Sequence, residues 1–252
     1  MILDEIVEEK KKQIEKLKKP GISLKNRLTG EELTLISEIK KASPSRGIIC
    51  DEFDPLGCLE EYHRGGADAI SVLTDEKYFQ GGNDIFRLVR ENTTLPLLRK
   101  EFIISPVQVY ESKFLGADVI LLIVAILSGE QLRELLRLAG ELGLEAIVEV
   151  HSKQELKIAT SLPAEIIGIN NRNLKDFTVD LETTGRMLDH LEAEGIRENY
   201  CIIAESGIGG PEDIEYLNRV GADGVLIGTE LMESERPARR IRELFAGIKE
   251  VK

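Results

Sequence analysis

The sequence predicts an α/β protein that folds as a (β/α)8 TIM barrel with an additional N-terminal helix before the first strand. Three observations predict this fold. Eight short apolar runs follow one another from Leu33 onward, amphipathic helical stretches separate them, and the tripeptide Gly-Ala-Asp precedes three of the runs. Short strands that alternate with helices form parallel βαβ units, and near-continuous apolar strands are typical of a sheet covered on both faces. Eight such units in about 220 residues make a barrel of nearly minimal size.

The first element is a helix that precedes the barrel. From Ile2 to Lys19 the apolar residues fall roughly on one helical face, and Pro20-Gly21 ends the helix. The segment has six lysines and five acidic residues, so we expect its polar face in solvent and its apolar face against the larger body. We therefore interpret the chain as one barrel domain, residues 1–252, in which residues 1–30 form an N-terminal helical extension.

The eight predicted strands are four to seven residues long. They are residues 33–39, 69–73, 95–99, 119–123, 145–150, 166–169, 201–204 and 224–227. In each Gly-Ala-Asp, glycine is expected to end the preceding helix, and Ala-Asp to fill the turn into the next strand. A doubly wound open sheet is the alternative fold. Because no GxGxxG motif follows the first strand, its dinucleotide-binding version is disfavoured.

The composition excludes several classes of protein. The chain has 252 residues, 42% of them hydrophobic, and its 33 basic and 45 acidic residues give a net charge of −12. This apolar fraction argues against a disordered chain, and the negative charge argues against nucleic-acid binding, which needs a basic surface. The longest apolar stretch, 119–127, is too short to span a membrane, and the charged N-terminus is not a secretory signal.

Cysteine and histidine usage predicts a cytoplasmic protein without a metal centre. Cys50, Cys58 and Cys201 are scattered and lack the spacing of metal ligands, which fits a reducing compartment. The three histidines lie far apart in the sequence, so no His-rich metal site is expected. We expect neither a metal nor a cofactor.

Barrel enzymes build their sites at the carboxyl ends of the strands, and here those ends carry charged and polar residues. The first strand ends in Glu38 and Lys40, and the third ends in Lys100. The later strands end in Glu149, Asn170, Arg172, Glu205, Ser206, Gly228 and Thr229. Charges at the tips of apolar strands cost desolvation free energy unless they are paired or used. A salt-bridge network could explain any one of them, but six such strand ends together predict an active site.

Two glycine-rich turns predict a phosphate site. Residues 205–211 (ESGIGGP) follow the seventh strand and residues 227–232 (IGTELM) follow the eighth, and each turn opens a helix. Backbone N–H groups at such turns bind anions, and barrel enzymes bind phosphate after these two strands. Lys40, Lys100 and Arg172 would make the mouth of the barrel locally cationic in an otherwise acidic protein. We therefore expect a small phosphorylated molecule as substrate.

These residues resemble the indole-3-glycerol-phosphate synthase family over essentially the whole chain. The matching motifs are EIKKASPSRG (38–47), YFQGG (78–82), LLRKEFI (97–103), IVEVHS (147–152), GINNRNL (168–174), AESGI (204–208) and LIGTELM (226–232). The resemblance implies a carboxy-lyase of tryptophan biosynthesis. Its substrate would be 1-(2-carboxyphenylamino)-1-deoxyribulose 5-phosphate, which loses CO₂ and water as it closes an indole ring to give indole-3-glycerol phosphate.

The resemblance also implies an acid–base pair. Lys100 would be the general acid and Glu149 the general base, while Lys40 would assist at the developing oxygen charge and Glu38 would hold Lys40. A free lysine has a pKa of about 10.4, and desolvation can lower it. We therefore expect the carboxylates and burial to tune these lysines toward proton transfer near neutral pH.

The remaining site residues follow from the same resemblance. Asn170, Glu205 and Ser206 would complete the catalytic set, with Glu205 facing the hydroxyl groups of the substrate. The substrate-binding set would be Ser43, Phe79, Phe102, Leu121, Arg172, Leu174, Gly207, Gly228 and Thr229. In that set, the serine, threonine and glycines would surround the phosphate, Arg172 would face the anthranilate carboxylate, and the phenylalanines and leucines would line the ring. Ordinary barrel packing is an equal alternative for these phenylalanines and leucines. His151 could be a second acid or base, but we predict a surface histidine in a loop.

Two alternatives come from different classes. A phosphoribosylanthranilate isomerase would use a cysteine and an aspartate as its acid–base pair, and no cysteine lies beside the end of the first strand. A non-catalytic barrel that only binds a phosphorylated ligand is disfavoured by the presence of both Lys100 and Glu149. We expect a monomer that binds neither nucleic acid nor membrane, and leave association with other tryptophan-pathway enzymes open.

Overall fold

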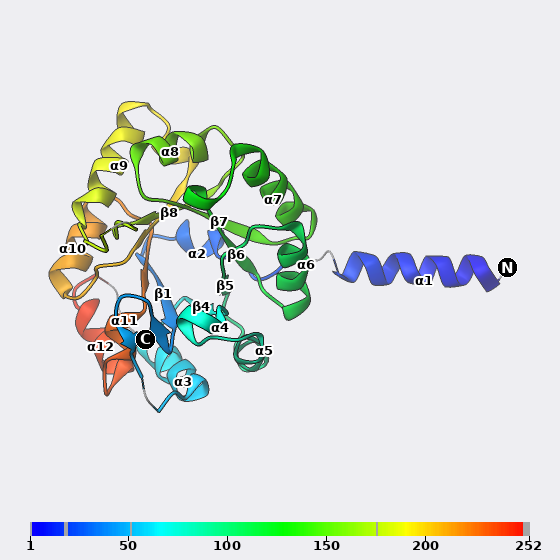
Figure 1. The fold of residues 1–252 in the computed structure, drawn as a ribbon, viewed down its shortest axis with the longest axis horizontal. Coiled ribbons are helices and arrows are strands. Elements are labelled where there is room, and N and C mark those ends of the chain that lie inside the picture. Colours follow the sequence, from blue (N-terminus) through cyan, green and yellow to red (C-terminus); the bar gives the residue numbers. More distant parts are fainter. Residues whose placement is uncertain (1, 18–19, 51, 175, 249–252) are drawn as a thin grey trace.

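The chain forms a closed barrel of parallel strands with helices around it (Figure 1). The computed structural model describes residues 2–17, 20–50, 52–174 and 176–248. Within these ranges, eight strands pair in the order β1-β10-β9-β8-β7-β6-β5-β4, and β1 also pairs with β4, which closes the ring. The prediction of a (β/α)8 barrel is therefore confirmed.

The barrel strands agree closely with the eight apolar runs. They are β1 (Thr34–Ile39), β4 (Ala69–Leu73), β5 (Leu97–Lys100), β6 (Val119–Ile123), β7 (Glu145–Val150), β8 (Ile166–Asn170), β9 (Cys201–Glu205) and β10 (Gly224–Ile227). A separate hairpin pairs β2 (Ala42–Ser43) with β3 (Gly47–Ile48). The third barrel strand starts two residues later than predicted because Pro96 has no N–H to donate, although its carbonyl accepts from Ile70 at 2.9 Å.

Helices follow the strands and cover the outside of the barrel (Figure 1). They are α1 (Ile2–Leu17), α2 (Lys25–Leu28), α3 (Pro55–Gly65), α4 (Glu76–Phe79), α5 (Asn83–Glu91), α6 (Pro106–Leu115), α7 (Gly129–Glu141), α8 (Lys153–Thr160), α9 (Glu182–Ala193), α10 (Pro211–Arg219), α11 (Thr229–Met232) and α12 (Pro237–Leu244). Two short 3₁₀ turns, η1 (Val124–Ile126) and η2 (Arg197–Asn199), complete the described elements. Buried aliphatic side chains of the strands and helices form the core between these two layers.

The Gly-Ala-Asp repeats act as the turns that their sequence predicts. Their glycines end α3 and α6 and follow α10, with left-handed φ angles of 87–89° that cost glycine little. The aspartates also tie neighbouring strands together. Asp68 accepts a hydrogen bond from the backbone N–H of Leu35 at 2.8 Å, and Asp118 accepts one from Leu97 at 3.0 Å. Each repeat therefore joins the amino ends of two strands.

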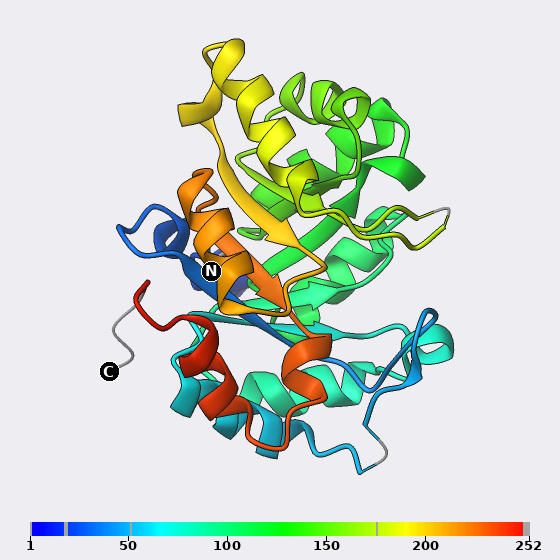
Figure 2. The same cartoon turned by 90° about the vertical axis from the view of Figure 1, so that its left-hand side faces the viewer.

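The amino-terminal end of the barrel is closed by the segment before β1. Leu24 and Leu28 are buried in the same apolar cluster as the residues that fill the barrel interior. Glu145, at the start of β7, accepts hydrogen bonds from the backbone N–H groups of Leu24 and Lys25 at 2.7 and 3.0 Å. Figure 2 shows α2 at the end of the barrel opposite to α4 and to the loop that follows β8. The carboxyl ends of the strands are therefore the end left open for a site.

The N-terminal helix forms as predicted, but it does not lie against the barrel. Figure 1 shows α1 projecting away from it, and Ile6 and Val7 are 50% and 45% exposed. The expectation of a packed helix is wrong because the many charged residues of α1, such as the Lys11–Glu8 pair, allow it to be solvated without a partner. Lys18, Lys19 and the side chains of Ile2, Leu3, Ile14 and Leu17 lie outside the described residues.

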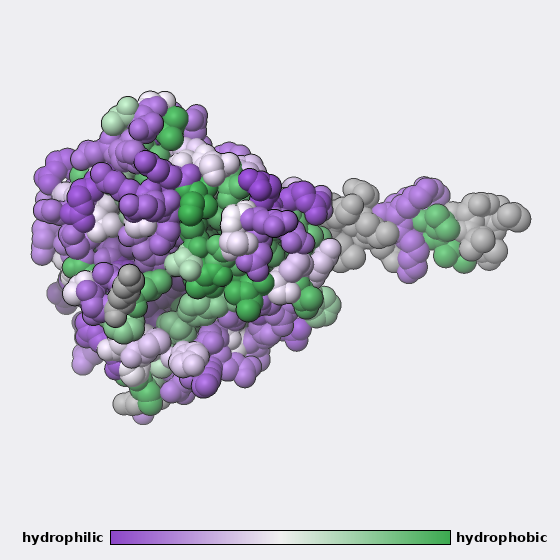
Figure 3. Space-filling view, turned by 45° about the horizontal axis from the view of Figure 1, so that its top comes forward, coloured by the Kyte–Doolittle hydropathy of each residue, from purple (hydrophilic) through white to green (hydrophobic). Residues whose placement is uncertain are grey.

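One face of the molecule carries both hydrophilic and hydrophobic residues. Figure 3 shows a hydrophobic band across the middle of this face, with hydrophilic residues around it. No described helix combines the length and the apolar character needed to cross a bilayer.

Candidate active site

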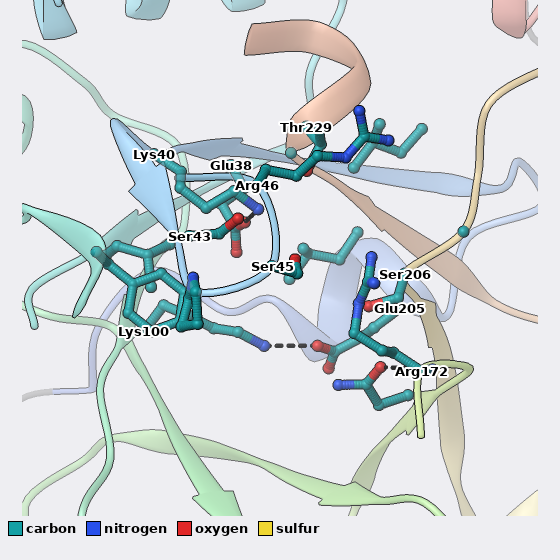
Figure 4. A pocket seen from close by; sticks show the side chains of 18 of the residues that line it. Glu38, Lys40, Ser43, Ser45, Arg46, Lys100, Arg172, Glu205, Ser206 and Thr229 are labelled. Carbon is teal, nitrogen blue, oxygen red and sulfur yellow. Dashed lines mark hydrogen bonds and ion pairs between the residues drawn. The ribbon is translucent and has the colours of Figure 1, made fainter. Parts of the chain in front are cut away.

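A cavity of about 750 Å³ opens at the carboxyl ends of the barrel strands. All eight barrel strands or the residues directly after them contribute to its lining, and all sixteen residues predicted for the site from the sequence line it. Figure 4 shows charged side chains from β1, β5 and β9 pointing into the same space. The fold therefore brings together residues that are up to 191 positions apart, from Glu38 to Thr229.

Lys100 is the central cation of the cavity. Its Nζ lies 2.5 Å from Oε2 of Glu205 and 3.1 Å from Oε2 of Glu149, and Figure 4 shows the first of these contacts as a dashed line. The side chains of the two glutamates are only 2% and 5% exposed, and that of Lys100 is 15% exposed. A lysine of β5 is thus held between carboxylates of β7 and β9.

Lys100, Glu149 and Glu205 form a triad of charged groups. The ionisation of this triad differs from what the sequence predicts. Burial by itself would lower the pKa of Lys100, but the charges of Glu205, Glu149 and Glu38 outweigh burial and raise that pKa above its ordinary value. The expectation that desolvation tunes this lysine downward is therefore wrong, because three carboxylates face one ammonium group. In the free protein, Lys100 is a firmly protonated acid.

The pKa values of the two glutamates of the triad are shifted in opposite directions. Burial would raise the pKa of Glu149, but the Lys100 ammonium, His151 and Asn170 outweigh it and lower that pKa to about 2. Burial, together with the charges of Glu149 and Glu38, outweighs the opposing effect of Lys100 and raises the pKa of Glu205 to about 7. One carboxylate of the pair is therefore ionised across the neutral range, whereas the other exchanges a proton near neutral pH.

A second lysine–glutamate pair lies at the end of β1. Nζ of Lys40 lies 2.7 Å from Oε1 of Glu38, which is 4% exposed. The hydroxyl of buried Tyr62 donates to the backbone carbonyl of Glu38 at 3.0 Å, which fixes the strand at this point. A Cβ on Gly228 would collide with Oε1 of Glu38 and come within 3.0 Å of Nζ of Lys40. The glycine after β10 therefore leaves room for this pair.

Asn170 and Arg172 lie where β8 ends. Nδ2 of Asn170 donates to Oε1 of Glu149 at 3.2 Å, and its Oδ1 accepts from the backbone N–H of Arg172 at 3.0 Å. Nη1 of Arg172 donates to the carbonyl of Phe177 at 3.3 Å, and both residues line the cavity. Asn170 thus orients both the Glu149 carboxylate and the start of the loop that follows β8.

The turn after β9 has the strained backbone of a functional site. Ser206 has φ of 68°, a left-handed value that costs a non-glycine residue roughly 1–3 kcal/mol. The buried amide of Asn171 donates to the carbonyls of Glu205 and Ser206 at 3.1 and 3.2 Å, which holds this conformation. Gly207 follows with φ of 85°.

Two buried polar atoms at the cavity have no hydrogen-bond partner among the described residues. They are Oγ of Ser43 and Oε1 of Glu205. Ser43 lies on the β2–β3 hairpin, and Gly207, Gly228 and Thr229 supply the backbone N–H groups of the two turns on the same cavity. A buried polar atom without a partner costs free energy, so both atoms are available for a ligand.

The predicted apolar residues differ in exposure: some are partly exposed at the cavity, and one is buried in the barrel interior. The rings of Phe79 and Phe102 are 6.0 Å apart between centroids with a 37° interplanar angle. Phe102 and Leu174 are 42% and 48% exposed and line the cavity, so both present apolar surface there. Leu121 is 2% exposed and belongs to the interior of the barrel, so packing describes it at least as well as contact.

His151 is the site-related residue that sequence reasoning placed incorrectly. Its side chain is only 9% exposed and lies beside Glu149, so the prediction of a surface histidine is wrong. The loop folds inward because Glu155 of α8 accepts hydrogen bonds from both the backbone N–H and Nδ1 of His151, at 2.7 and 3.2 Å. Its position two residues after Glu149 was the available signal.

Further cavity residues were absent from the predicted set. Among them are Ser45, Arg46, Tyr78, Glu101 and Phe177. Ser45 and Arg46 lie inside the ASPSRG motif, which is a signal that could have found them, whereas nothing in the sequence marks Phe177. Within the described ranges, no cluster of three or more His, Cys, Asp or Glu side chains has the geometry of a metal site, and no cysteine lines the cavity.

A family model and two similar bacterial proteins carry the same name. The family described as indole-3-glycerol phosphate synthase matches residues 3–244. The protein of that name from Petrotoga mobilis is 52% identical over 245 residues, which covers 97% of each chain. The one from Thermoanaerobacter pseudethanolicus is 44% identical over 247 residues, which covers 92% of this chain and 93% of the relative.

Solved structures with a similar fold are much more distant in sequence. Thiamine phosphate pyrophosphorylase from Pyrococcus furiosus superposes with a TM-score of 0.63 at 19% identity, covering 91% of this chain and 99% of the other. 3-Hexulose-6-phosphate synthase from Salmonella typhimurium gives 0.61 at 12% identity, covering 84% and 96%. These likenesses show the barrel fold alone. Since the family match and the relatives span nearly the whole chain, this protein belongs to the indole-3-glycerol phosphate synthase family.

Proposed function

We propose that this protein converts 1-(2-carboxyphenylamino)-1-deoxyribulose 5-phosphate to indole-3-glycerol phosphate, CO₂ and water. The observation that carries the proposal is the position of Lys100 between Glu149 and Glu205, at 3.1 and 2.5 Å, on the cavity that also holds the Lys40–Glu38 pair. Ring closure needs a proton donor and dehydration needs a proton acceptor. This arrangement supplies both within one buried group of residues.

The substrate is anionic at both ends, and the cavity has a separate place for each end. The phosphate lies at the turns of Gly207 and Gly228, where backbone N–H groups and the unpartnered hydroxyl of Ser43 meet it. The aromatic ring lies against Phe79 and Phe102, with its carboxylate toward Arg172. Support for this orientation comes from the distribution of these groups around one cavity.

In the first step, the ring carbon that bears the carboxylate attacks the ketone carbon and a C–C bond forms. The ketone oxygen takes the proton of Lys100, which is held as an ammonium group by its carboxylate neighbours. The C–C bond to the carboxylate then breaks, and its electron pair restores the aromatic ring as CO₂ leaves. Lys40, with Glu38 beside it, stabilises the negative charge that develops on the oxygen.

In the second step, the hydroxyl group leaves as water and a C=C bond forms. Glu149, ionised across the neutral range, takes the proton from the carbon next to the nitrogen. Glu205, with a pKa of about 7, returns a proton to Lys100 over a distance of 2.5 Å. Lys100 passes this proton to the departing hydroxyl group, so Lys100 is neutral again when Glu149 takes the proton from carbon. Positioned acids and bases each contribute roughly 10²–10⁴-fold to rate.

The direct test is to mix the protein with this substrate and follow indole fluorescence. We expect product at micromolar enzyme without added metal or cofactor. Lys100→Met is the matched control for contaminating activity. An absence of product from folded wild-type protein would contradict the proposed function.

A further inference from the structure

His151 bridges the proposed base to a second carboxylate that lies outside the cavity. Its Nε2 is 3.1 Å from Oε1 of Glu149, and its Nδ1 is 3.2 Å from Oε2 of Glu155. The contact to Glu149 has the distance of an ion pair without the alignment of a straight hydrogen bond. Glu155 is not among the residues that line the cavity, and it holds both the ring and the backbone N–H of His151.

The surroundings of the ring favour the imidazolium form. A neutral imidazole has one N–H donor, whereas both ring nitrogens here face carboxylate oxygens. Burial disfavours the charged form, but the neighbouring carboxylates of Glu149 and Glu155 outweigh it and raise the pKa of His151 to about 9. His151 is therefore a second cation on Glu149 at neutral pH.

The two cations contact different oxygens of Glu149. Lys100 contacts Oε2 at 3.1 Å, whereas His151 contacts Oε1, which also accepts from Asn170. In the proposed function, Lys100 gives up its proton during ring closure, before Glu149 is needed as a base. At that moment the ammonium charge that holds Glu149 ionised is lost, whereas the charge on His151 remains beside it.

We propose that His151, clamped by Glu155, is a positioning residue that orients the Glu149 carboxylate and keeps it ionised after Lys100 has lost its proton. The inference rests on the proposed function and deepens it. It assigns to the loop after β7 the role of a fixed counter-charge, since His151 has carboxylates on both sides and no direct place on the cavity lining.

Among the described residues, charged and polar groups from three neighbouring elements face this bridge. Lys100 faces Glu149 from β5 and Asn170 faces it from β8, while Glu155 faces His151 from α8. Glu205 and Glu38 raise the pKa of Lys100, and the charge of Glu149 raises the pKa of Glu205 directly. The turn η1, which packs against β7 and α8, is Val-Ala-Ile and carries no charge.

The first test measures the pKa of His151 in the absence of substrate. The ring of His151 is titrated by NMR in the wild type, in Glu155→Gln and in Glu149→Gln, with His63 and His190 as internal references. We expect a wild-type pKa near the value of about 9 given above, and a decrease of about one unit or more in each variant. A wild-type His151 that titrates near the ordinary value of about 6.5 would overturn the proposal.

The second test measures how substitution of His151 changes kcat and KM. For His151→Ala and His151→Asn, we expect kcat to fall about 10- to 100-fold, less than the loss expected for removing an acid or base itself, with KM within about threefold. Added imidazole should restore part of the kcat of His151→Ala. His190→Ala on α9 is the matched control and should keep wild-type kcat.

The outcomes separate the two proposals. If folded His151→Ala and His151→Asn both keep wild-type kcat while the wild type forms product, the positioning role is wrong and the proposed function stands. If His151→Asn, which supplies a neutral donor, keeps wild-type kcat while His151→Ala does not, the role of His151 as a counter-charge is wrong. If the wild type forms no product but the NMR titration shows the bridge, the proposed function fails and with it the catalytic role of His151. If His151→Ala does not fold, His151→Asn and Glu155→Gln carry the kinetic test.

Discussion

The ammonium group of Lys100 lies 2.5 Å from the buried carboxylate of Glu205, at the carboxyl ends of strands that do not neighbour each other in the barrel. The contact crosses the open end of the barrel from β5 to β9 (Figure 4). A short ion pair across this opening costs desolvation free energy, which packing alone does not require. The pair therefore marks the centre of the proposed chemistry, and the first two predictions concern it.

Removing the ammonium group should abolish turnover but not binding. We expect Lys100→Met to lower kcat by about 10² to 10⁴-fold, because the ammonium group that donates to the ketone oxygen is removed, while the affinity for the substrate changes by roughly tenfold or less. Indole fluorescence measures the first quantity and isothermal titration calorimetry the second. Turnover near that of the wild type would show that Lys100 is not the acid.

The acidity of Glu205 should be visible in the pH dependence of the free enzyme. Its raised pKa of about 7 makes it neutral below that pH and ionised above it. We expect an inflection near pH 7 in the profile of kcat/KM, which reports groups of the free enzyme, and its loss in Glu205→Gln. A persistent inflection in that variant would assign the titration to another group.

His151 should make stability depend on pH in the alkaline range. Its pKa is raised from 6.5 to about 9 in the folded protein, so its contribution is complete below pH 6.5 and is lost as pH rises through about 9. We expect Tm of the wild type to decrease more than that of His151→Asn between pH 6.5 and 10. Differential scanning calorimetry of both proteins gives this difference, and parallel curves would contradict it.

Space at Gly228 should matter for binding more than for folding. A Cβ there would collide with Glu38 and crowd Lys40 at one of the two turns proposed to bind the phosphate. We expect Gly228→Ala to raise KM about tenfold or more, which corresponds to about 1.4 kcal/mol. Steady-state kinetics measures this change.

The matched glycine control is Gly140 in α7, where nothing lies within 4 Å of the added Cβ. Gly140→Ala should leave KM unchanged and stabilise the helix by up to about 1 kcal/mol. Equal effects of the two substitutions on KM would contradict the steric argument at Gly228.

The fold and most of the cavity could be predicted from the sequence because both depend on local pattern. Apolar runs define the strands, and the strand ends supply Glu38, Lys100 and Glu149. The family prediction is confirmed by the match over residues 3–244. The roles of the individual site residues stay predictions until they are measured.

Other properties depend on contacts between distant segments. The raised pKa of Lys100 is the balance of burial against carboxylates from three other strands, and a list of residues does not give that balance. The burial of His151 depends on Glu155 folding back from α8. The position of α1 is not encoded in its amphipathic pattern, which indicates an apolar face but not whether the barrel covers it.

The aspartates of the Gly-Ala-Asp repeats lie at the end of the barrel opposite to the cavity. Asp68, Asp118 and Asp223 accept hydrogen bonds from Leu35, Leu97 and Ile202 at the amino ends of three strands. Strand register is thus held on the face where no chemistry takes place. Loops on the other face can be exchanged or lengthened without removing these bonds, so the scaffold is suited to acquiring new substrate preferences without losing its ability to fold.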